Sequence, residues 1–407
     1  MAAANEMVSK YMPDEITVSI LSKLPLKSLK RFECVHKSWS LLFENHYFMN
    51  KFRNNFLSYN NDPSSLILKG YKRGKEVFFS SSGERFENKV QLDWSSSFQN
   101  RFRTTDILGS GSVNGTLCFY GSYGDIVLWN PATQAIKPLP DSKSQFIEGS
   151  IPDEDEDEAL GYPYVAVAFY EHGFGYDPVT NDYKVIRFVN IHLERYDDTD
   201  DDIVTLDPSS YKGLDLDPFW EIYSLKSNSW RKLHVDKPHS CFCSRGTGVC
   251  MDGVCHWVCK DNRPCLVSFY LSNEKFFVTL IPSDVDDSFV DTSTWIKLAV
   301  LNGSITLISY HENTTTFHIS ILGEFGLEES WTKLLIVGPL SCVERPIGVG
   351  MKGEIVFIRK DNELVWLDLS TQIVAELGYK GEFDPWSRST RIIVYKESIL
   401  PIEGIGD

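Results

Sequence analysis

Long hydrophobic runs are missing from this sequence of 407 residues. The longest, such as residues 165–170, are far shorter than the roughly 20 apolar residues of a membrane-spanning helix. The N-terminal segment also lacks the basic region and the apolar core of a secretory signal peptide. We therefore expect a protein of the cytoplasm, the nucleus or both, with no membrane partner.

Positive charge is also scarce. The chain has 40 Lys and Arg against 56 Asp and Glu, which gives a formal net charge of −16. Affinity for nucleic acid depends mainly on cationic side chains that neutralise phosphates. Nucleic acid is therefore not expected as the main partner. The composition, 42% hydrophobic and 13% aromatic, is that of a folded globular protein.

Motifs for metal binding and catalysis are missing as well. Six of the nine cysteines lie between Cys241 and Cys265, but their spacing does not give the two close pairs of a structural zinc site. Cys255, Trp257 and Cys259 alternate along one expected strand, which is typical of buried thiols. There is no G-x-S-x-G or H-E-x-x-H motif, and the Gly-rich residues 109–115 do not match a phosphate-binding loop. We expect no metal, no cofactor and no catalytic residue.

The first sixty residues differ from the rest in charge and pattern. They carry eight basic and five acidic side chains, whereas the remaining chain is strongly acidic. Pro13 suits the first turn of a helix and Pro25 ends it, with an apolar stripe between them made of Ile16, Ile20, Leu21 and Leu24. Two more short helices are expected after Pro25. A helical unit of this size, residues 8–55, cannot form a sufficient core alone, so it must pack on the following domain or on another chain.

These N-terminal residues carry a family resemblance. The segments MPDE (12–15), ILSKLPLKSL (20–29) and RFECVHKSW (31–39) together resemble the F-box, in particular its plant form. In that family the F-box binds an SKP-type adaptor, which links it to a cullin-RING ubiquitin ligase. Position by position, the resemblance implies nine adaptor-binding residues: Pro13, Ile16, Ile20, Leu21, Leu24, Pro25, Leu29, Val35 and Trp39.

Beyond residue 60 the helical pattern gives way to short β-rich runs separated by turns. In a recurring unit a large residue ends a strand, a polar turn follows, and a second large residue appears seven positions later. Clear copies begin at Trp129, Tyr176 and Tyr223, and weaker ones at Phe269 and Leu367. The starts are 47, 47, 46 and 98 residues apart, and the last gap holds two periods. A period near 48 residues predicts a repeat protein.

Turn pairs form a second landmark that keeps a similar period. Asn114-Gly115, Asp252-Gly253, Asn302-Gly303 and Lys352-Gly353 lie between β-rich runs, and the last three are spaced by 50 residues. Asn-Gly and Asp-Gly supply the positive φ that tight hairpins need. Two hairpins in each repeat give four strands, which is the content of a propeller blade.

The repeated body resembles a kelch-like β-propeller and, more closely, the F-box-associated domain of plant F-box proteins. The resemblance is carried by segments such as YDPVTNDYK (176–184) and the ending IIVYKES (392–398). It implies a mostly β protein with an α-helical F-box and a propeller over residues 62–400. The length allows seven units of about 49 residues, and six complete blades plus an irregular one fit equally well. The whole layout is also similar to the S-locus F-box group.

Two acidic segments within the body, residues 148–162 and 190–218, are expected to be loops. Runs of this kind are usually solvated. The alternative is that neighbouring loops attract a basic target protein through their field. The candidate target-binding residues are Asp153, Glu154, Asp155, Glu156, Asp157, Glu158, Asp197, Asp198, Asp200, Asp201 and Asp202.

Together these observations predict a non-catalytic substrate-recognition subunit of an SKP–cullin–F-box ubiquitin ligase. The F-box would bind the adaptor and the β body would bind a target protein for ubiquitination. Two functions of other classes stay open. One is a kelch-like interaction scaffold that recruits no ligase, and the other is a propeller hydrolase.

Overall fold

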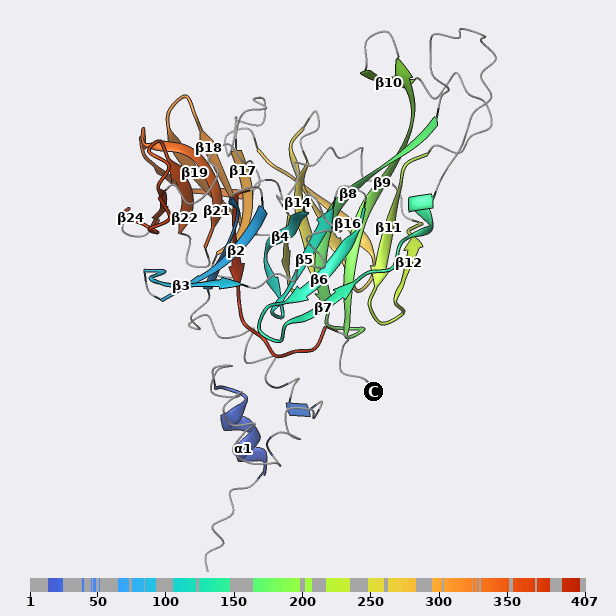
Figure 1. Ribbon diagram of the computed structural model, residues 1–407, viewed down its shortest axis with the longest axis horizontal. Coiled ribbons are helices and arrows are strands. Elements are labelled where there is room, and N and C mark those ends of the chain that lie inside the picture. The colour runs from blue at the N-terminus through green and yellow to red at the C-terminus, as the bar shows by residue number, and fades with distance from the viewer. Residues whose placement is uncertain are drawn as a thin grey trace, which may run out of the picture.

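The computed structural model shows a ring of β-sheet with a helical part below it (Figure 1). It describes residues 14–24, 39, 45, 47–48, 51, 65–72, 75–83, 85–92, 105–121, 124–146, 164–197, 202–206, 217–234, 248–259, 263–282, 295–301, 304–323, 325–326, 328, 331–350, 354–369, 372–380 and 390–402. The α-helix named α1 (Asp14–Leu21) has eight residues. In the described part of the chain, no helix is long and apolar enough to cross a membrane.

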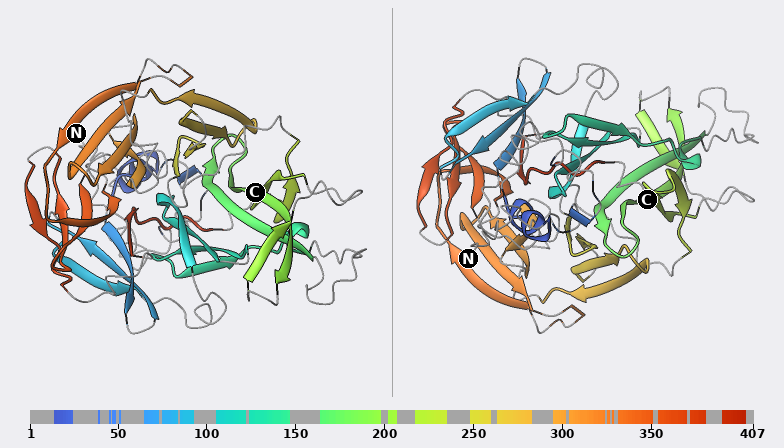
Figure 2. Two further views of the ribbon diagram at one scale, coloured as in Figure 1. Left: turned by 90° about the horizontal axis from the view of Figure 1, so that it is seen from above. Right: turned by 90° about the horizontal axis from the view of Figure 1, so that it is seen from below.

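Six antiparallel blades make up the described β-structure and follow one another around the ring (Figure 2). Blade 1 holds β1 (Ser65–Lys72), β2 (Lys75–Ser82) and β3 (Asn88–Leu92). Blade 2 holds β4 (Thr105–Val113), β5 (Thr116–Gly121), β6 (Ile126–Asn130) and β7 (Ala135–Pro138), and the 3₁₀ helix η1 (Lys143–Phe146) follows it. Blade 3 holds β8 (Tyr164–Asp177), β9 (Asp182–Asp197), β11 (Phe219–Ser224) and β12 (Ser229–Lys232), with β10 (Asp202–Leu206) beside β9.

The remaining three blades have four strands each, paired in chain order. Blade 4 holds β13 (Val249–Met251), β14 (Val254–Cys259), β15 (Cys265–Tyr270) and β16 (Lys275–Leu280). Blade 5 holds β17 (Trp295–Leu301), β18 (Ser304–His311), β19 (Thr316–Leu322) and β20 (Trp331–Val337). Blade 6 holds β21 (Val343–Val349), β22 (Ile355–Arg359), β23 (Leu364–Leu367) and β24 (Val374–Glu376).

The ring closes through the C-terminal strand, β25 (Arg391–Tyr395). It pairs antiparallel with β1, so that Ser65 lies opposite Tyr395. Blade 1 therefore takes one strand from the end of the chain and three from the start of the body. On its other side β25 meets β4 of blade 2 through a single parallel pair, Val394 with Gly111. Backbone hydrogen bonds between the two ends of the body thus hold the propeller closed.

Each blade is buried on both faces because it lies between two neighbours. Successive side chains of a strand point to opposite faces. Leu66 and Leu68 accordingly pack toward blade 6, while Ile67 packs toward blade 2. One buried apolar cluster fills each of the six junctions between described blades. This packing explains the continuous apolar runs, since every residue of β6 (IVLWN) and of β14 (VCHWVC) is buried.

The tight hairpins expected from the turn pairs are confirmed at two places. Asn114-Gly115 joins β4 to β5, and Asp252-Gly253 joins β13 to β14. Both residues of each pair have positive φ, from 49° to 76°, as a type I′ turn requires. Asn302-Gly303 and Lys352-Gly353 lie outside the described residues.

The repeated turn unit does not occur once in each blade. Its copies at Tyr176 and Tyr223 lie in the same blade, because the first joins β8 to β9 and the second joins β11 to β12. The three other copies join the third and fourth strands of blades 2, 4 and 6. Both kinds of hairpin need a positive-φ residue at the end of the turn, such as Asn181 (55°) or Asn228 (48°). The turn pattern therefore does not specify which strands it joins, and two of its copies fall in blade 3.

The sequence predicted a loop for the acidic segment at residues 190–218, but part of this segment forms strands. β9 continues to Asp197, and β10 pairs with its last residues. With the first residues of β8 they form a three-stranded extension of blade 3, which we call the arm (residues 164–168, 190–197 and 202–206). In β9 the buried Ile191 and Leu193 alternate with the polar residues Asn190, His192 and Glu194. This strand alternation is hidden by the high acidic content. The other acidic segment, residues 148–162, lies outside the described residues.

Candidate functional site

The local sequence of α1 accounts for both of its ends. Asp14 and Glu15 occupy the first turn, where negative charge complements the helix dipole. The last turn tightens, because the Lys23 and Leu24 amides donate to the carbonyls three residues earlier at 3.1 and 3.0 Å. The helix then stops ahead of Pro25, which has no amide hydrogen to donate. The helix lies between Pro13 and Pro25, as expected, and the two prolines themselves lie outside the described residues.

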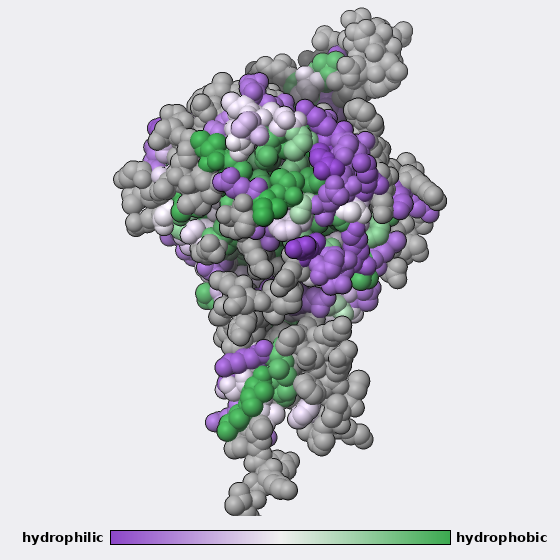
Figure 3. Space-filling view, turned by 90° about the vertical axis from the view of Figure 1, so that its left-hand side faces the viewer, coloured by the Kyte–Doolittle hydropathy of each residue, from purple (hydrophilic) through white to green (hydrophobic). Residues whose placement is uncertain are grey.

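The apolar stripe of α1 divides into two faces. Val18 and Leu21 are 5% exposed, whereas Ile16 is 49% and Ile20 48% exposed. The two isoleucines are one helical turn apart and therefore lie side by side. Figure 3 shows apolar residues of this helix at the surface of the part below the ring. Leu21, expected on the adaptor-binding surface, is instead buried within this chain.

The other expected adaptor-binding residues are only partly described. Leu24 and Trp39 are half-buried, and Trp39 is in a helical conformation. Pro13, Pro25, Leu29 and Val35 lie outside the described residues. The described part of the helical unit thus presents one exposed apolar pair, Ile16 and Ile20, with Leu24 and Trp39 partly accessible.

The arm lies on the side of the ring away from α1 (Figure 1). At its end Asp202 pairs with Asp197 across β10 and β9. On one face the Tyr164 hydroxyl donates to Glu194 Oε2 at 2.8 Å, and His192 Nε2 lies 2.9 Å from Glu194 Oε1. The hydrogen bond to Glu194 raises the pKa of Tyr164. Of the eleven acidic residues predicted to bind a target, Asp197 and Asp202 lie within the described residues, and the arm brings these two together.

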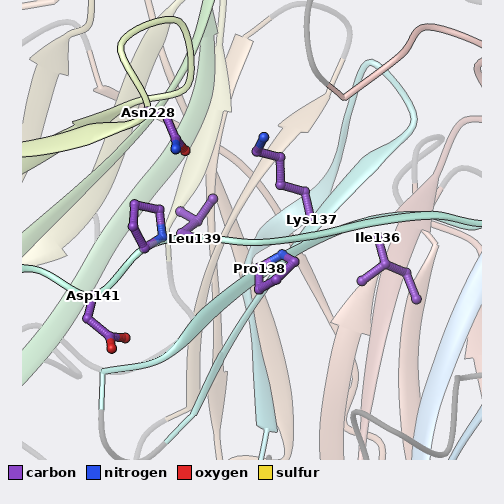
Figure 4. Close-up of a pocket in the computed structure, with 7 residues that line it drawn as sticks. Ile136, Lys137, Pro138, Leu139, Asp141 and Asn228 are labelled. Atoms are coloured by element: carbon purple, nitrogen blue, oxygen red, sulfur yellow. The ribbon is translucent and has the colours of Figure 1, made fainter.

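An open pocket of about 460 Å³ lies where the outer strand of blade 2 meets blade 3 (Figure 4). Lys137, Asp141 and Asn228 contribute its polar groups, and the rest of the lining is Ile136, Pro138, Leu139 and Pro140. Trp230 Nε1 donates to the Pro140 carbonyl at 2.8 Å and fixes one wall. The lining holds no histidine, hydroxyl or thiol, so this pocket is suited to binding and not to nucleophilic catalysis. Sequence patterns gave no signal for it, because Asn228 lies far along the chain from residues 136–141.

Two buried groups have the perturbed pKa values that often mark a catalytic site. Burial lowers the pKa of His256 to about 4. Burial, assisted by the nearby Arg391 charge, lowers the pKa of Lys297 to about 7. Both side chains are buried in the propeller, and neither lines the pocket of Figure 4. Their shifts therefore reflect packing, and they do not form an accessible acid–base pair.

The cysteines of blade 4 behave as the alternating pattern predicts. Cys255, Cys259 and Cys265 are buried in the apolar cluster between blades 3 and 4. Among the described residues, no group of three His, Cys, Asp or Glu side chains is placed to hold a metal ion.

Comparison with protein families matches two regions of the chain. Residues 11–51 match the F-box domain, and residues 65–381 match the F-box associated beta propeller domain. The chain is 26% identical over 407 residues to F-box protein CPR1 of Arabidopsis thaliana, covering 94% of this chain and 87% of that protein. It is 25% identical over 279 residues to F-box protein At1g11270 of the same plant, covering 67% of this chain and 76% of that protein.

Proposed function

Because the chain belongs to the F-box proteins that carry an F-box associated β-propeller domain, we propose that it is the substrate-recognition subunit of an SKP–cullin–F-box ubiquitin ligase. Its F-box binds an SKP-type adaptor and its propeller binds a target protein, in the cytoplasm or the nucleus. The chain makes and breaks no bond itself. It raises the effective concentration of the target's lysines near the ubiquitin-charged enzyme.

The exposed pair Ile16 and Ile20 is the observation that supports adaptor binding most directly. Each isoleucine leaves about half of its surface in water although the opposite face of α1 is buried. Burying a whole isoleucine contributes roughly 1.5 to 3 kcal/mol, so covering both exposed halves contributes a similar amount. The proposed contact set centres on this pair and extends to Pro13, Leu24, Pro25, Leu29, Val35 and Trp39. Leu21 supports the helix from its buried side.

The two interaction sites of this proposal lie on opposite sides of the ring. α1 lies below the blades and the arm rises above them (Figure 1). A target bound on the arm side is therefore held away from the adaptor, and both can bind at once. The acidic residues of the arm and of residues 153–158 favour a target with a basic surface.

Binding to a purified SKP-type adaptor tests the proposal. Ile16→Asp with Ile20→Asp is expected to weaken binding by about 100-fold, roughly 3 kcal/mol, because two charges then face an apolar partner surface. Lys23→Asp is the matched control. It introduces the same residue at an exposed polar position near the end of α1 and is expected to bind almost as well as wild type.

Two results would count against the proposal. If wild type binds no SKP-type adaptor, the protein is a scaffold without a ligase. If the double variant binds as tightly as wild type, the exposed isoleucine pair is not the adaptor site. The thermal unfolding of the propeller should be the same in all three proteins, which separates lost binding from lost folding.

A further inference from the structure

Two cysteines of blade 4 lie directly opposite each other. Cys250 on β13 pairs with Cys255 on β14, one position beyond the pair Met251 and Val254 that flanks the turn. Asp252 and Gly253 form this turn, with φ of 51° and 74°. The ubiquitin ligase function makes no use of this thiol pair.

The register of this hairpin brings the two side chains unusually close. In a two-residue turn the flanking residues form a hydrogen-bonded pair, so the next pair outward is a non-hydrogen-bonded one. At such a pair the Cα atoms are about 4.5 Å apart and the side chains approach more closely than at a hydrogen-bonded pair. Disulfides span Cα separations of roughly 4.4 to 6.8 Å. The backbone of β13 and β14 is therefore already suited to a bond between Cys250 and Cys255.

The two thiols differ in a way that suits stepwise oxidation. Cys255 is 1% exposed, whereas Cys250 is half-buried. Hydrogen bonding to Cys250, with burial as the second cause, raises the pKa of Cys255 well above its ordinary value. Cys255 therefore keeps its proton. Cys250 is the more accessible residue of the pair.

The neighbouring strand leaves room for these sulfur atoms only because it carries glycine. A Cβ atom at Gly175 of β8 would lie 2.5 Å from Cys250 Sγ, and one at Gly173 would lie 2.7 Å from Cys255 Sγ. Any larger residue at either position would collide with the thiol pair. Strand β8 of blade 3 thus covers both sulfur atoms on one side, which favours a reaction between them over a reaction with a large external thiol.

We propose that Cys250 and Cys255 form a reversible disulfide, making this hairpin a peroxide-sensitive modification site. The Cys250 thiolate attacks hydrogen peroxide, the O–O bond breaks, and a sulfenic acid forms on Cys250 as hydroxide leaves. The Cys255 sulfur then attacks the sulfenic sulfur, the S–O bond breaks, and the hydroxyl leaves as water with the Cys255 proton. In total two thiols and one peroxide give one disulfide and two waters, and a thiol reductant reverses the reaction.

A second cysteine pair in the same blade serves as an internal comparison. Cys259 and Cys265 are opposite each other on β14 and β15. Backbone hydrogen bonds alternate in direction along a strand, so residues of β14 that do not bond toward β13 bond toward β15. Cys259 and Cys265 therefore form a hydrogen-bonded pair, with the side chains farther apart. Both thiols are also buried, so peroxide is expected to react with them last.

Mass spectrometry of the full-length wild-type protein tests the proposal. The protein is treated with hydrogen peroxide, alkylated, and digested with trypsin, which cuts after Arg245 and Lys260 to release residues 246–260. This peptide holds Cys250, Cys255 and Cys259. Without peroxide it should carry three alkyl groups. After peroxide it should carry one, on Cys259, and otherwise be two hydrogens lighter than the free thiol peptide.

Variants identify the order of events. Cys255→Ser should leave Cys250 as a sulfenic acid that dimedone traps, with no disulfide formed. Cys342, a half-buried thiol elsewhere in the body, should not acquire an internal disulfide under the same conditions. The proposal is overturned if the wild-type peptide keeps three alkyl groups while Cys342 is oxidised, or if the disulfide includes Cys259. Adaptor binding is not needed for the assay, so a failure of the proposed ligase function would leave its result intact.

Discussion

Acidification from pH 7 to pH 5 is expected to weaken the folding of the propeller through His256. The ring of this histidine is 1% exposed and stacks on Phe325, with its centroid 5.1 Å from that of the phenyl ring. Its Nδ1 lies 2.8 Å from Ser268 Oγ. Burial lowers the pKa of His256 to about 4, against about 6.5 for a histidine in an unfolded chain. Between these two values His256 is mostly neutral in the folded state and mostly protonated in the unfolded state.

The size and direction of the effect follow from these two values. Because the pKa of His256 is lower in the folded state, its contribution to the free energy of unfolding is fully present above about pH 6.5. This contribution is lost as the pH falls toward 4. The difference between the two pKa values corresponds to about 3 kcal/mol of stability, of which about 2 kcal/mol is lost between pH 7 and pH 5. This window lies above the ordinary pKa of carboxyl groups, about 4, so their titration adds little.

Urea unfolding followed by tryptophan fluorescence at pH 7, 6 and 5 measures this loss. His256→Gln removes the titrating ring and should show a free energy of unfolding that falls about 2 kcal/mol less than that of wild type over the same range. His234→Gln changes an exposed histidine of blade 3 and should follow wild type. Equal pH dependence in all three proteins would refute the reasoning, since it would mean that the folded protein accommodates a charged His256.

Two further predictions concern a buried ion pair and the acidic surface. Arg187 Nε donates to Glu221 Oε1 at 2.7 Å, and both residues are buried, so Arg187→Met should destabilise the protein by about 3 to 5 kcal/mol through the unpaired carboxylate. Adding Glu221→Met should recover part of that loss in urea unfolding, and a double variant no more stable than the single one would contradict this account. Replacing Asp153–Glu158 by Asn and Gln should slow the association of a basic target and flatten its dependence on salt in stopped-flow binding. An unchanged on-rate would make these residues an ordinary solvated loop.

Features that depend on a few adjacent residues could be predicted from the sequence. Pro13 and Pro25 delimit α1, because proline fits the first turn of a helix and cannot continue one. Asn114-Gly115 and Asp252-Gly253 mark hairpins, because these residues tolerate positive φ. The alternation of Cys255 and Cys259 indicated buried thiols in a strand. In each case the physical cause lies within a few residues of its effect.

Features that depend on distant residues could not be predicted in this way. The exposed pair Ile16 and Ile20 and the buried Leu21 belong to one apolar stripe in the sequence, and packing alone assigns them to different faces. The arm was hidden because its acidic content resembles that of a loop, although β9 and β10 pair as strands. The pocket beside Lys137 needs a wall from blade 3, which no local pattern reports.

The sequence by itself determined the division into a helical F-box and a repeated β body, since hydrophobic periodicity and turn chemistry are local properties. Tertiary structure alone decided that the described body has six blades, that β25 completes the first of them, and that Cys250 and Cys255 lie against glycines of another blade. The reason is that the same turn can join different strands. A strand finds its partner through the packing of both faces, and that packing involves residues far away in the chain.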